Sequence, residues 1–403
     1  MKSYALAGAG ARGAYMFAKP LAAEYSHAGR LAGIFDTNAG RARDLGRECG
    51  GVPVYEDFDK MLCVERPDAV IVATVDRYHH EYAIRAMEAG CDVISEKPMT
   101  TCAENCLAIL EAEQRTGRKV TVTFNMRFMP YMALAKELLR GGAVGTALNV
   151  DLEWFLDTSH GADYFRRWHR QLVNSGGLLV HKSTHHFDLV NWWLEDEPAE
   201  VRALGSLRFY GPARAERGER CLTCGHSKTC GFYFDLLADE TCSRLYYRHE
   251  ALDGYVRDRC VFAEEIDIFD TMSVQVRYQK GASLSYSLVA YSPYEGWRAT
   301  ISGTDGRMEL GEIYSGASRG QLPITVYDRR GGRAFYEAGN TSGSHGGGDS
   351  RLQRMLFEGG VPDPLGQQAD SRAGAMSVLI GAAANQSIQT GLPVAIATLP
   401  ERS

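Results

Sequence analysis

The feature that most constrains this chain is a glycine pattern close to its first residue. The stretch "SYALAGAGARGAYMFAKPLA" is typical of a buried strand, a glycine turn and a helix, and it carries the run Gly8-Ala9-Gly10-Ala11-Arg12-Gly13. This run fits G-x-G-x-x-G in the context that the pattern needs. The glycines allow a tight turn and a close approach of backbone to a pyrophosphate, and the helix offers its first amides to the anion. The pattern therefore predicts a dinucleotide site.

A second apolar run, "LAGIFDTN", ends at Asp36, 23 residues after Gly13. A carboxylate at the tip of the second strand accepts a hydrogen bond from the adenosine ribose and repels a 2′-phosphate, so the position favours NAD over NADP. Arg41 is near in sequence and leaves NADP open. The alternative is a glycine turn and a surface aspartate in some other α/β protein.

Three further segments have the pattern of a strand next to a helix. They are "DAVIVATVDRYHHEYAIRAMEAG", "CDVISEKPM" and "KVTVTFNMRF", and they predict a parallel sheet with covering helices that ends near Phe124. A chain of 403 residues is too long for one ordinary core. We expect an α/β protein with a Rossmann domain over 1–124 and a second α/β domain over 125–403.

The net charge limits the partners of the chain. A formal charge of −6 argues against nucleic acid, because a phosphate footprint needs a basic surface. The apolar runs are interrupted every few residues, so no membrane partner is expected. The first residues enter a strand pattern without a signal-peptide region, and the simplest expectation is a cytoplasmic protein.

A lysine follows the strand expected at "ISEKPMT". Glu96, Lys97 and Pro98 would lie at the carboxyl end of a parallel strand, where open α/β sheets bind ligands. Pro98 restricts Lys97 to extended geometry. A lysine beside a nicotinamide can take the proton of a substrate hydroxyl when burial lowers its pKa. The alternative is a solvated surface lysine.

Several segments resemble the glucose-fructose oxidoreductase / inositol dehydrogenase / MocA family of NAD(P)-dependent sugar oxidoreductases. The resemblance rests on "GAGARG", "ATVDRYHHEYAIRAMEAGCDVISEKP", "FNMRFMPYMALAKELLRGGAVG" and "SGGLLVHKSTHHFD", and more loosely on "SVLIGAAANQSIQTGLPV". It implies a Rossmann domain, then an α/β domain with a large, mostly antiparallel sheet that serves as a homo-oligomer interface in a dimer or tetramer. A C-terminal helix would return to the first domain.

The resemblance also implies roles for single residues. Lys97 matches the family's catalytic lysine and His185 its catalytic histidine, while Asp188 and Arg127 match substrate-binding positions. On the cofactor side the matching positions are Thr74, His79, Glu96, Lys97 and Asn125.

The stretch "GGLLVHKSTHHFDLVNWW" departs from the family pattern. A helix from about Leu179 onward would place His181, His185 and Asp188 on one face. His181 stands where the family usually has aspartate. We interpret it as a second acid/base group beside Lys97 and His185. The alternatives are a divalent metal site, to which His345 could add a ligand, and satisfied core histidines. His345 is also a candidate substrate-binding residue, because its glycine-rich segment could close over the substrate.

An arginine-rich segment, "DYFRRWHRQ", precedes that stretch. Arginine forks suit carboxylate, phosphate or sulfonate groups, and aromatic faces suit sugar rings. Arg166 and Arg167 are therefore candidate ligands for an acidic sugar, although solvated or paired arginines are an equal alternative.

Half of the ten cysteines fall in a predicted insertion at about 208–262. The spacing Cys221-x2-Cys224-x5-Cys230 predicts a structural zinc site, with Cys260 preferred over Cys242 or His226 as the fourth ligand. Unliganded thiols and an iron-sulfur or redox role are the alternatives.

Together these patterns predict an NAD-dependent oxidoreductase that moves hydride at a ring CH–OH of a sugar, inositol or glycoside, an acidic sugar among them. The first alternative is an NAD-dependent glycoside hydrolase. It would oxidise C3 transiently, eliminate the aglycone, add water and reduce the product with the same cofactor. The second is a non-catalytic NAD-binding sensor, which would not need acid/base groups beside the nicotinamide.

Overall fold

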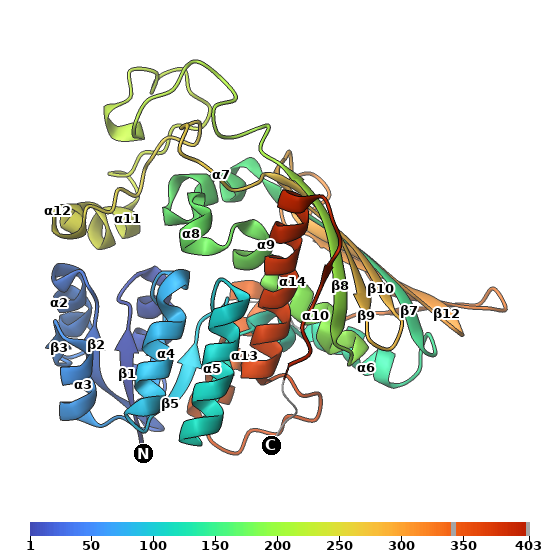
Figure 1. Ribbon diagram of the computed structural model, residues 1–403, viewed down its shortest axis with the longest axis horizontal. Helices are drawn as coiled ribbons and strands as arrows, with labels where there is room; N and C mark the ends of the chain where they lie inside the picture. Colours follow the sequence, from blue (N-terminus) through green and yellow to red (C-terminus); the bar gives the residue numbers. More distant parts are fainter. Residues whose placement is uncertain (340–343, 400–403) are drawn as a thin grey trace.

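The computed structural model describes residues 1–339 and 344–399, so the predicted end of the second domain at residue 403 lies outside it. The chain forms two β-sheets that lie side by side, with helices packed on and between them (Figure 1). The predicted fold class is confirmed: a Rossmann-like sheet comes first, and a large, mostly antiparallel sheet follows.

The first sheet has the strand order β16-β6-β5-β4-β1-β2-β3. Strands β1 to β6 pair in parallel, whereas β16 pairs antiparallel with β6 and extends the sheet beyond the expected edge. Near-continuous apolar runs make the central strands buried on both faces. The strands are β1 (Lys2–Ala7), β2 (Gly29–Phe35), β3 (Val54–Tyr55), β4 (Ala69–Val72), β5 (Asp92–Ser95), β6 (Val120–Val122) and β16 (Ala369–Asp370).

Helices connect these strands and cover the sheet. A π-helical turn, η1 (Gly13–Ala18), follows the glycine loop, and the short 3-10 turns η2 (Asp76–Tyr78) and η3 (Asn125–Phe128) follow β4 and β6. The helices of this part are α1 (Lys19–Ala22), α2 (Ala39–Glu48), α3 (Phe58–Glu65), α4 (His79–Glu88) and α5 (Ala103–Thr116).

The second sheet has ten strands in the order β15-β14-β12-β11-β7-β10-β9-β8-β17, with β13 paired to β12. All of its pairs are antiparallel except β7 with β10. The strands are β7 (Ala147–Asp157), β8 (Pro198–Ser206), β9 (Thr271–Tyr278), β10 (Ser283–Ser292), β11 (Gly296–Gly303), β12 (Gly306–Ile313), β13 (Gly320–Gln321), β14 (Ile324–Asp328), β15 (Arg333–Tyr336) and β17 (Val394–Ala395).

One face of this sheet is covered by helices, and the strands alternate buried and exposed residues accordingly. The helices between β6 and β8 are α6 (Pro130–Arg140), α7 (Thr158–Arg166), α8 (Leu172–Ser175), α9 (Leu178–His181) and α10 (Thr184–Leu194), with the 3-10 turn η4 (Trp168–Arg170). After β15 come η7 (Ser344–Gly347), α13 (Gly348–Phe357) and α14 (Ser371–Thr390).

The long helix α14 packs on both parts of the molecule, against α5 of the first and β8, α9 and α10 of the second (Figure 1). Its small residues make this close approach possible. A Cβ at Gly374 would lie 2.8 Å from the Val122 side chain, and one at Gly381 would lie 2.4 Å from the Leu179 carbonyl oxygen. The backbone of α14 is therefore held close to β6 of the first sheet and to α9 of the second part.

The connection between β8 and β9 is the predicted insertion. It contains η5 (Cys221–Thr223), α11 (Glu240–Leu245), η6 (Tyr247–His249) and α12 (Glu250–Asp253), and it extends over the first domain beside α2 (Figure 1). None of the described helices has both the length and the apolar character needed to cross a bilayer.

Candidate active site

The residues predicted to bind a cofactor follow strands of the first sheet at their carboxyl ends. Gly8 follows β1, Asp36 follows β2, Thr74 follows β4, Glu96 follows β5 and Asn125 follows β6. Because these strands are parallel, the five positions share one edge of the sheet. That edge faces α9, α10 and the insertion.

The glycine loop has no room for side chains at two of its glycines. Gly8 has a φ of +104°, and a Cβ there would lie 2.4 Å from the carbonyl oxygen of Ala73. A Cβ at Gly13 would lie 1.9 Å from the carbonyl oxygen of Gly8. By contrast, a Cβ at Gly10 would meet only the Tyr246 hydroxyl, at 3.6 Å. The loop therefore packs as tightly as a dinucleotide-binding turn requires and stays open at Gly10.

Asp36 is buried and accepts three hydrogen bonds. Its carboxylate accepts from the Ala9 amide (2.6 Å), from the Asn38 amide (2.7 Å) and from the Arg41 guanidinium (3.1 Å). A carboxylate offers about four acceptor positions, so one remains for a ribose hydroxyl.

A polar network joins the glycine loop to α13. Arg12 donates to Glu96 (2.7 Å) and lies 3.7 Å from Asp349. Asp349 also accepts from Asn125 (2.6 Å) and pairs with His345 (2.8 Å). His345 is therefore linked through Asp349 to the carboxyl edge of the first domain, and it does not border the cavity of the insertion cysteines.

Lys97 follows β5, and its side chain is half-buried. Its Nζ donates to the carbonyl oxygen of His181 at 3.0 Å. Burial lowers the pKa of the Lys97 ammonium to about 8, against the opposing effect of the Asp76 and Glu96 carboxylates. His79 lies between the carbonyl oxygens of Pro98 (2.8 Å) and Thr74 (3.2 Å), so it bridges the loops after β4 and β5.

The expected single helix through the histidine stretch is wrong. The structure has two helices, α9 ending at His181 and α10 beginning at Thr184. The His185 amide donates to Lys182, three residues back, and not to His181. The His181 carbonyl is therefore left for Lys97, and the buried Ser183 hydroxyl bonds Tyr286 at the break. His181 therefore ends one helix, whereas His185 and Asp188 belong to the next.

His181 pairs with Asp76, a residue that the sequence analysis missed. The distance from His181 Nδ1 to Asp76 Oδ2 is 2.5 Å, and both side chains are buried. Burial raises the pKa of Asp76 and lowers that of His181, so both partners are driven toward their neutral forms. Asp76 begins η2 after β4, and although it lies in a segment that carries the family resemblance, no role was predicted for it.

His185 and His169 complete a group of buried imidazoles. Desolvation lowers the pKa of each, and the Lys97 charge adds to that effect. Among the described residues, His185 Nδ1 and both ring nitrogens of His169 have no hydrogen-bond partner. The His169 ring stacks on Trp168, with centroids 3.6 Å apart, and meets the edge of His181 at 4.0 Å. These nitrogens are available to a ligand.

A chain of polar groups within the second domain approaches His181 from α7. His160 contacts Glu295 (2.9 Å) and the Tyr164 hydroxyl (3.0 Å). The Tyr164 ring then lies 5.5 Å from the His181 ring. Burial raises the pKa of Tyr164, which keeps the phenol protonated.

Arg127 and Asp188 bind each other. The guanidinium makes two bonds to the carboxylate, 2.7 Å from Nε and 2.6 Å from Nη2, and both groups are buried. This bidentate pair satisfies the charge of each partner. Asp188 therefore faces Arg127 and not the His181–Asp76 pair.

The two candidate arginines point to different places. Arg166 donates to the Cys221 sulfur (3.2 Å) and to the Phe232 carbonyl, so it is part of the insertion's packing. Arg167 pairs with Asp163 at 2.8 Å. It also borders a pocket of about 500 Å³ between η4, α8 and the segment after α12. This pocket is further lined by the basic and polar side chains of Trp168, Arg170, Gln171, Asn174, Tyr255 and Arg259 and by the carboxylates of Asp253 and Glu265.

The insertion cysteines gather as expected but form no metal cage. Cys221, Cys224, Cys230 and Cys260 border one small cavity together with His226. Within residues 1–339 and 344–399, no group of three or more histidine, cysteine or acidic side chains is placed to hold a metal ion. The structure gives the predicted zinc no support, either here or at His181, His185 and Asp188.

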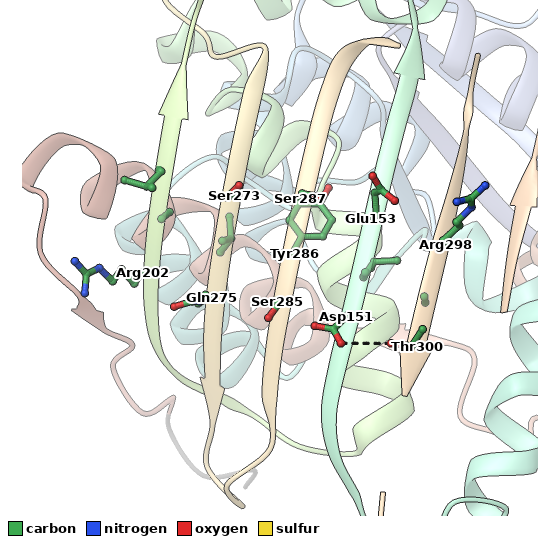
Figure 2. Close-up of a pocket in the computed structure, with 15 residues that line it drawn as sticks. Asp151, Glu153, Arg202, Ser273, Gln275, Ser285, Tyr286, Ser287, Arg298 and Thr300 are labelled. Carbon is green, nitrogen blue, oxygen red and sulfur yellow. Dashed lines mark hydrogen bonds between the residues drawn. The ribbon is translucent and has the colours of Figure 1, made fainter. Parts of the chain in front are cut away.

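The open face of the second sheet carries a further shallow pocket. Figure 2 shows the polar side chains that project from it, with Asp151 and Glu153 on one strand and Arg298 and Thr300 on the next. Asp151 accepts a hydrogen bond from Thr300 at 3.3 Å. This face is remote from Lys97, because helices α9 and α10 lie on the opposite face of the sheet (Figure 1).

Comparisons with known proteins agree with this architecture. Residues 2–124 match the family model of the NAD-binding Rossmann fold of the Gfo/Idh/MocA oxidoreductases, and residues 136–396 match its C-terminal alpha/beta domain. The chain is 38% identical to "Putative oxidoreductase YteT" of Bacillus subtilis, over 99% of both chains. It is 33% identical to "Inositol 2-dehydrogenase 2" of Saccharopolyspora erythraea, over 42% of this chain and 47% of that one.

A solved structure of levoglucosan dehydrogenase, in complex with NADH and levoglucosan, shares the fold. Its TM-score is 0.71 at 20% identity, and the likeness covers 98% of this chain and all of that one. The two family models together match most of the sequence. The chain belongs to the Gfo/Idh/MocA family of oxidoreductases.

Proposed function

We propose that this protein is an NAD-dependent oxidoreductase that acts on a ring CH–OH of a sugar, inositol or glycoside. The observation that carries the proposal is Lys97, a half-buried lysine at the carboxyl end of β5 whose pKa is about 8. A lysine with this pKa has a neutral fraction near physiological pH, and that fraction can accept a hydroxyl proton as hydride leaves the same carbon. The inositol and levoglucosan dehydrogenases named above are similar proteins whose names point to the same substrate class.

The edge around Gly8 fits a dinucleotide. The loop is closed at Gly8 and Gly13 and open at Gly10, and Asp36 keeps one acceptor position for a ribose hydroxyl. NAD bound at this edge would supply the hydride acceptor. Glu96 holds Arg12, and Asp349 holds Asn125. These two residues would position the nicotinamide end of the cofactor.

The protein's own groups would handle the protons. The His181 carbonyl orients the Lys97 Nζ, which takes the substrate hydroxyl proton. His185 has an unpaired Nδ1 and can hold the same or a neighbouring hydroxyl. Burial lowers the pKa of Lys97, His181 and His185, so each loses its positive charge more readily than in water and less charge opposes the loss of hydride from carbon.

The arginine-lined pocket supports an acidic substrate group. Arg170 is 3% exposed, and two of its guanidinium nitrogens have no partner within the described chain. Its single ion pair is with the half-exposed Glu265. Together with Arg167, Arg259 and the Trp168 ring, Arg170 offers forks for a carboxylate beside an apolar sugar face.

A glycoside hydrolase that recycles NAD is the second candidate. A simple dehydrogenase needs one base for one hydroxyl, whereas elimination and water addition need further proton transfers. The His181–Asp76 pair and the Tyr164–His160–Glu295 chain are additional proton-carrying groups near Lys97. They favour this candidate specifically.

The test follows NADH absorbance and aglycone release in parallel on neutral and acidic sugars and aryl glycosides. NADH that accumulates in proportion to substrate supports the oxidoreductase. Aglycone released over many turnovers without net NADH supports the glycosidase. If neither signal appears with any substrate although NAD binds, the catalytic proposal fails. Arg170→Gln should raise KM for acidic substrates about tenfold and leave neutral substrates unchanged; equal effects on both would remove the acidic group from the proposal.

Self-association through the open sheet face belongs to the same proposal. On this face the acidic side chains of β7 lie beside Arg298 of β11, and Arg202 of β8 lies three strands away (Figure 2), so two copies related by a two-fold axis can pair opposite charges. Light scattering of the wild type against an Arg202→Glu/Arg298→Glu variant tests it. Dimers in the wild type and monomers in the variant are expected; equal masses would contradict the interface.

A further inference from the structure

The insertion reaches the predicted nucleotide edge of the first domain. The Tyr246 hydroxyl accepts a hydrogen bond from the Ala11 amide at 3.0 Å, in the middle of the glycine loop. The Asn38 side chain donates to the His249 carbonyl (2.9 Å), and the His249 ring pairs with Asp44 (2.7 Å). Two separate points of the insertion therefore touch the loops after β1 and β2.

A third contact is an ion triad. Arg41 Nη2 lies 3.1 Å from Asp36 and 3.1 Å from Asp253, which is the last residue of α12. The three side chains are 10%, 7% and 18% exposed, so solvent screens the triad little. The other oxygen of Asp253 accepts from the Tyr255 amide at 3.0 Å, which fixes the carboxylate in place. Asp36 is the residue expected to hold the ribose, so Asp253 lies one side chain away from the ribose position.

We infer that Asp253 is a specificity residue of the nucleotide site and that the insertion, through it, sets the preference for NAD over NADP. The inference rests on the proposed nucleotide site. An arginine just after the second strand is a natural partner for a 2′-phosphate. Here that guanidinium is shared between two carboxylates. A phosphate at this position would therefore meet an arginine already paired and two negative charges.

The competing explanation is that Asp253 only fastens the insertion to the first domain. The two explanations differ in what they do to the two nucleotides. A fastener affects NAD and NADP alike, whereas a specificity residue changes the ratio of their dissociation constants. If Asp253 is a specificity residue, any gain in NADP binding requires an Arg41 that has been released from Asp253.

The experiment measures dissociation constants of NAD and NADP for the full chain by calorimetry, without any sugar. Asp253→Asn keeps the shape and the oxygen that accepts from Tyr255. We expect it to tighten NADP binding about tenfold, or 1.4 kcal/mol, and to leave NAD within about twofold. The double variant Arg41→Ala/Asp253→Asn should lose that gain. Glu250→Gln, a carboxylate of the same helix that pairs with Arg220, is the matched control and should change neither nucleotide.

Two results would overturn this inference and leave the proposed function standing. In the first, the wild type binds NAD and Asp253→Asn leaves the NADP-to-NAD ratio unchanged. In the second, the double variant keeps the full NADP gain, which would assign the effect to net charge and not to Arg41. If the wild type binds neither nucleotide, the proposed function fails and the inference fails with it. Thermal melts of each variant show whether it is folded.

Discussion

Two groups of ionisable residues lie along the carboxyl edge of the first domain. In one group burial favours the neutral forms, and in the other ion pairs preserve the charges. Around Lys97, burial drives the lysine, Asp76 and His181 toward neutral forms. Around Arg41, ion pairs with Asp36 and Asp253 outweigh burial and raise the pKa of the guanidinium. The difference separates two tasks. Groups that exchange protons must be able to change charge near pH 7, whereas groups that position a ligand must keep theirs.

The strongest way to break this comparison is to remove the lysine. Lys97→Met should lower kcat about a thousandfold, because the base for the substrate hydroxyl is lost. NAD affinity, measured by calorimetry, should change far less. Lys136→Met is the matched control, since Lys136 is a buried lysine that pairs with Glu195 far from the site. It should lower stability and leave kcat close to the wild-type value. Equal losses of kcat in both variants would contradict the role of Lys97.

The His181–Asp76 pair should matter next. His181→Asn and Asp76→Asn should each lower the turnover about a hundredfold, because a buried proton carrier or its partner is removed. The readout is split between NADH formation and aglycone release. A larger loss of aglycone release than of NADH formation favours the glycosidase. A loss confined to NADH formation favours the plain oxidoreductase, and no loss in either would assign the pair to packing.

The pH profile sharpens the same comparison. Only neutral Lys97 accepts a proton, so kcat/KM for oxidation should rise with pH and level off above about 8. The Glu96 carboxylate raises the pKa of Lys97, so Glu96→Gln should move the rising limb to lower pH. Asp349→Asn changes a carboxylate on the far side of Arg12 and serves as the control. A limb that does not move in Glu96→Gln would show that another group is titrating.

How far the sequence predicts this site depends on how local each signal is. The glycine loop, Asp36 and the Glu96-Lys97-Pro98 run follow buried strands directly, and the structure places them at one edge as that pattern indicates. Asp76 and His169 carry no local signal, because their importance comes from packing against His181 across the two parts of the chain.

Two other results depended on tertiary contacts. At the break between α9 and α10 Lys97 takes the His181 carbonyl, a contact that no pattern within the histidine stretch reveals. The insertion was expected to hold a structural zinc, and its contact with Ala11 and Arg41 depends on α11 and α12, which have ordinary polar sequences. The helical conformation of such segments can be predicted from their sequence, but the surface on which they pack cannot.

The smallest expected effect tests whether docking of the insertion and chemistry at Lys97 are separate. Arg244 in α11 donates to Tyr15 (2.7 Å) and pairs with Glu48, both in the first domain, and it lies away from Lys97. Because these ion pairs are partly exposed, each contributes no more than about 1 kcal/mol. Arg244→Ala should therefore weaken NAD binding about threefold and leave kcat at saturating NAD unchanged. Arg217→Ala, which removes a pair within the insertion itself, is the control and should affect neither. A fall in kcat for Arg244→Ala would mean that the insertion also shapes the proton-carrying group, and the two tasks would not be separable.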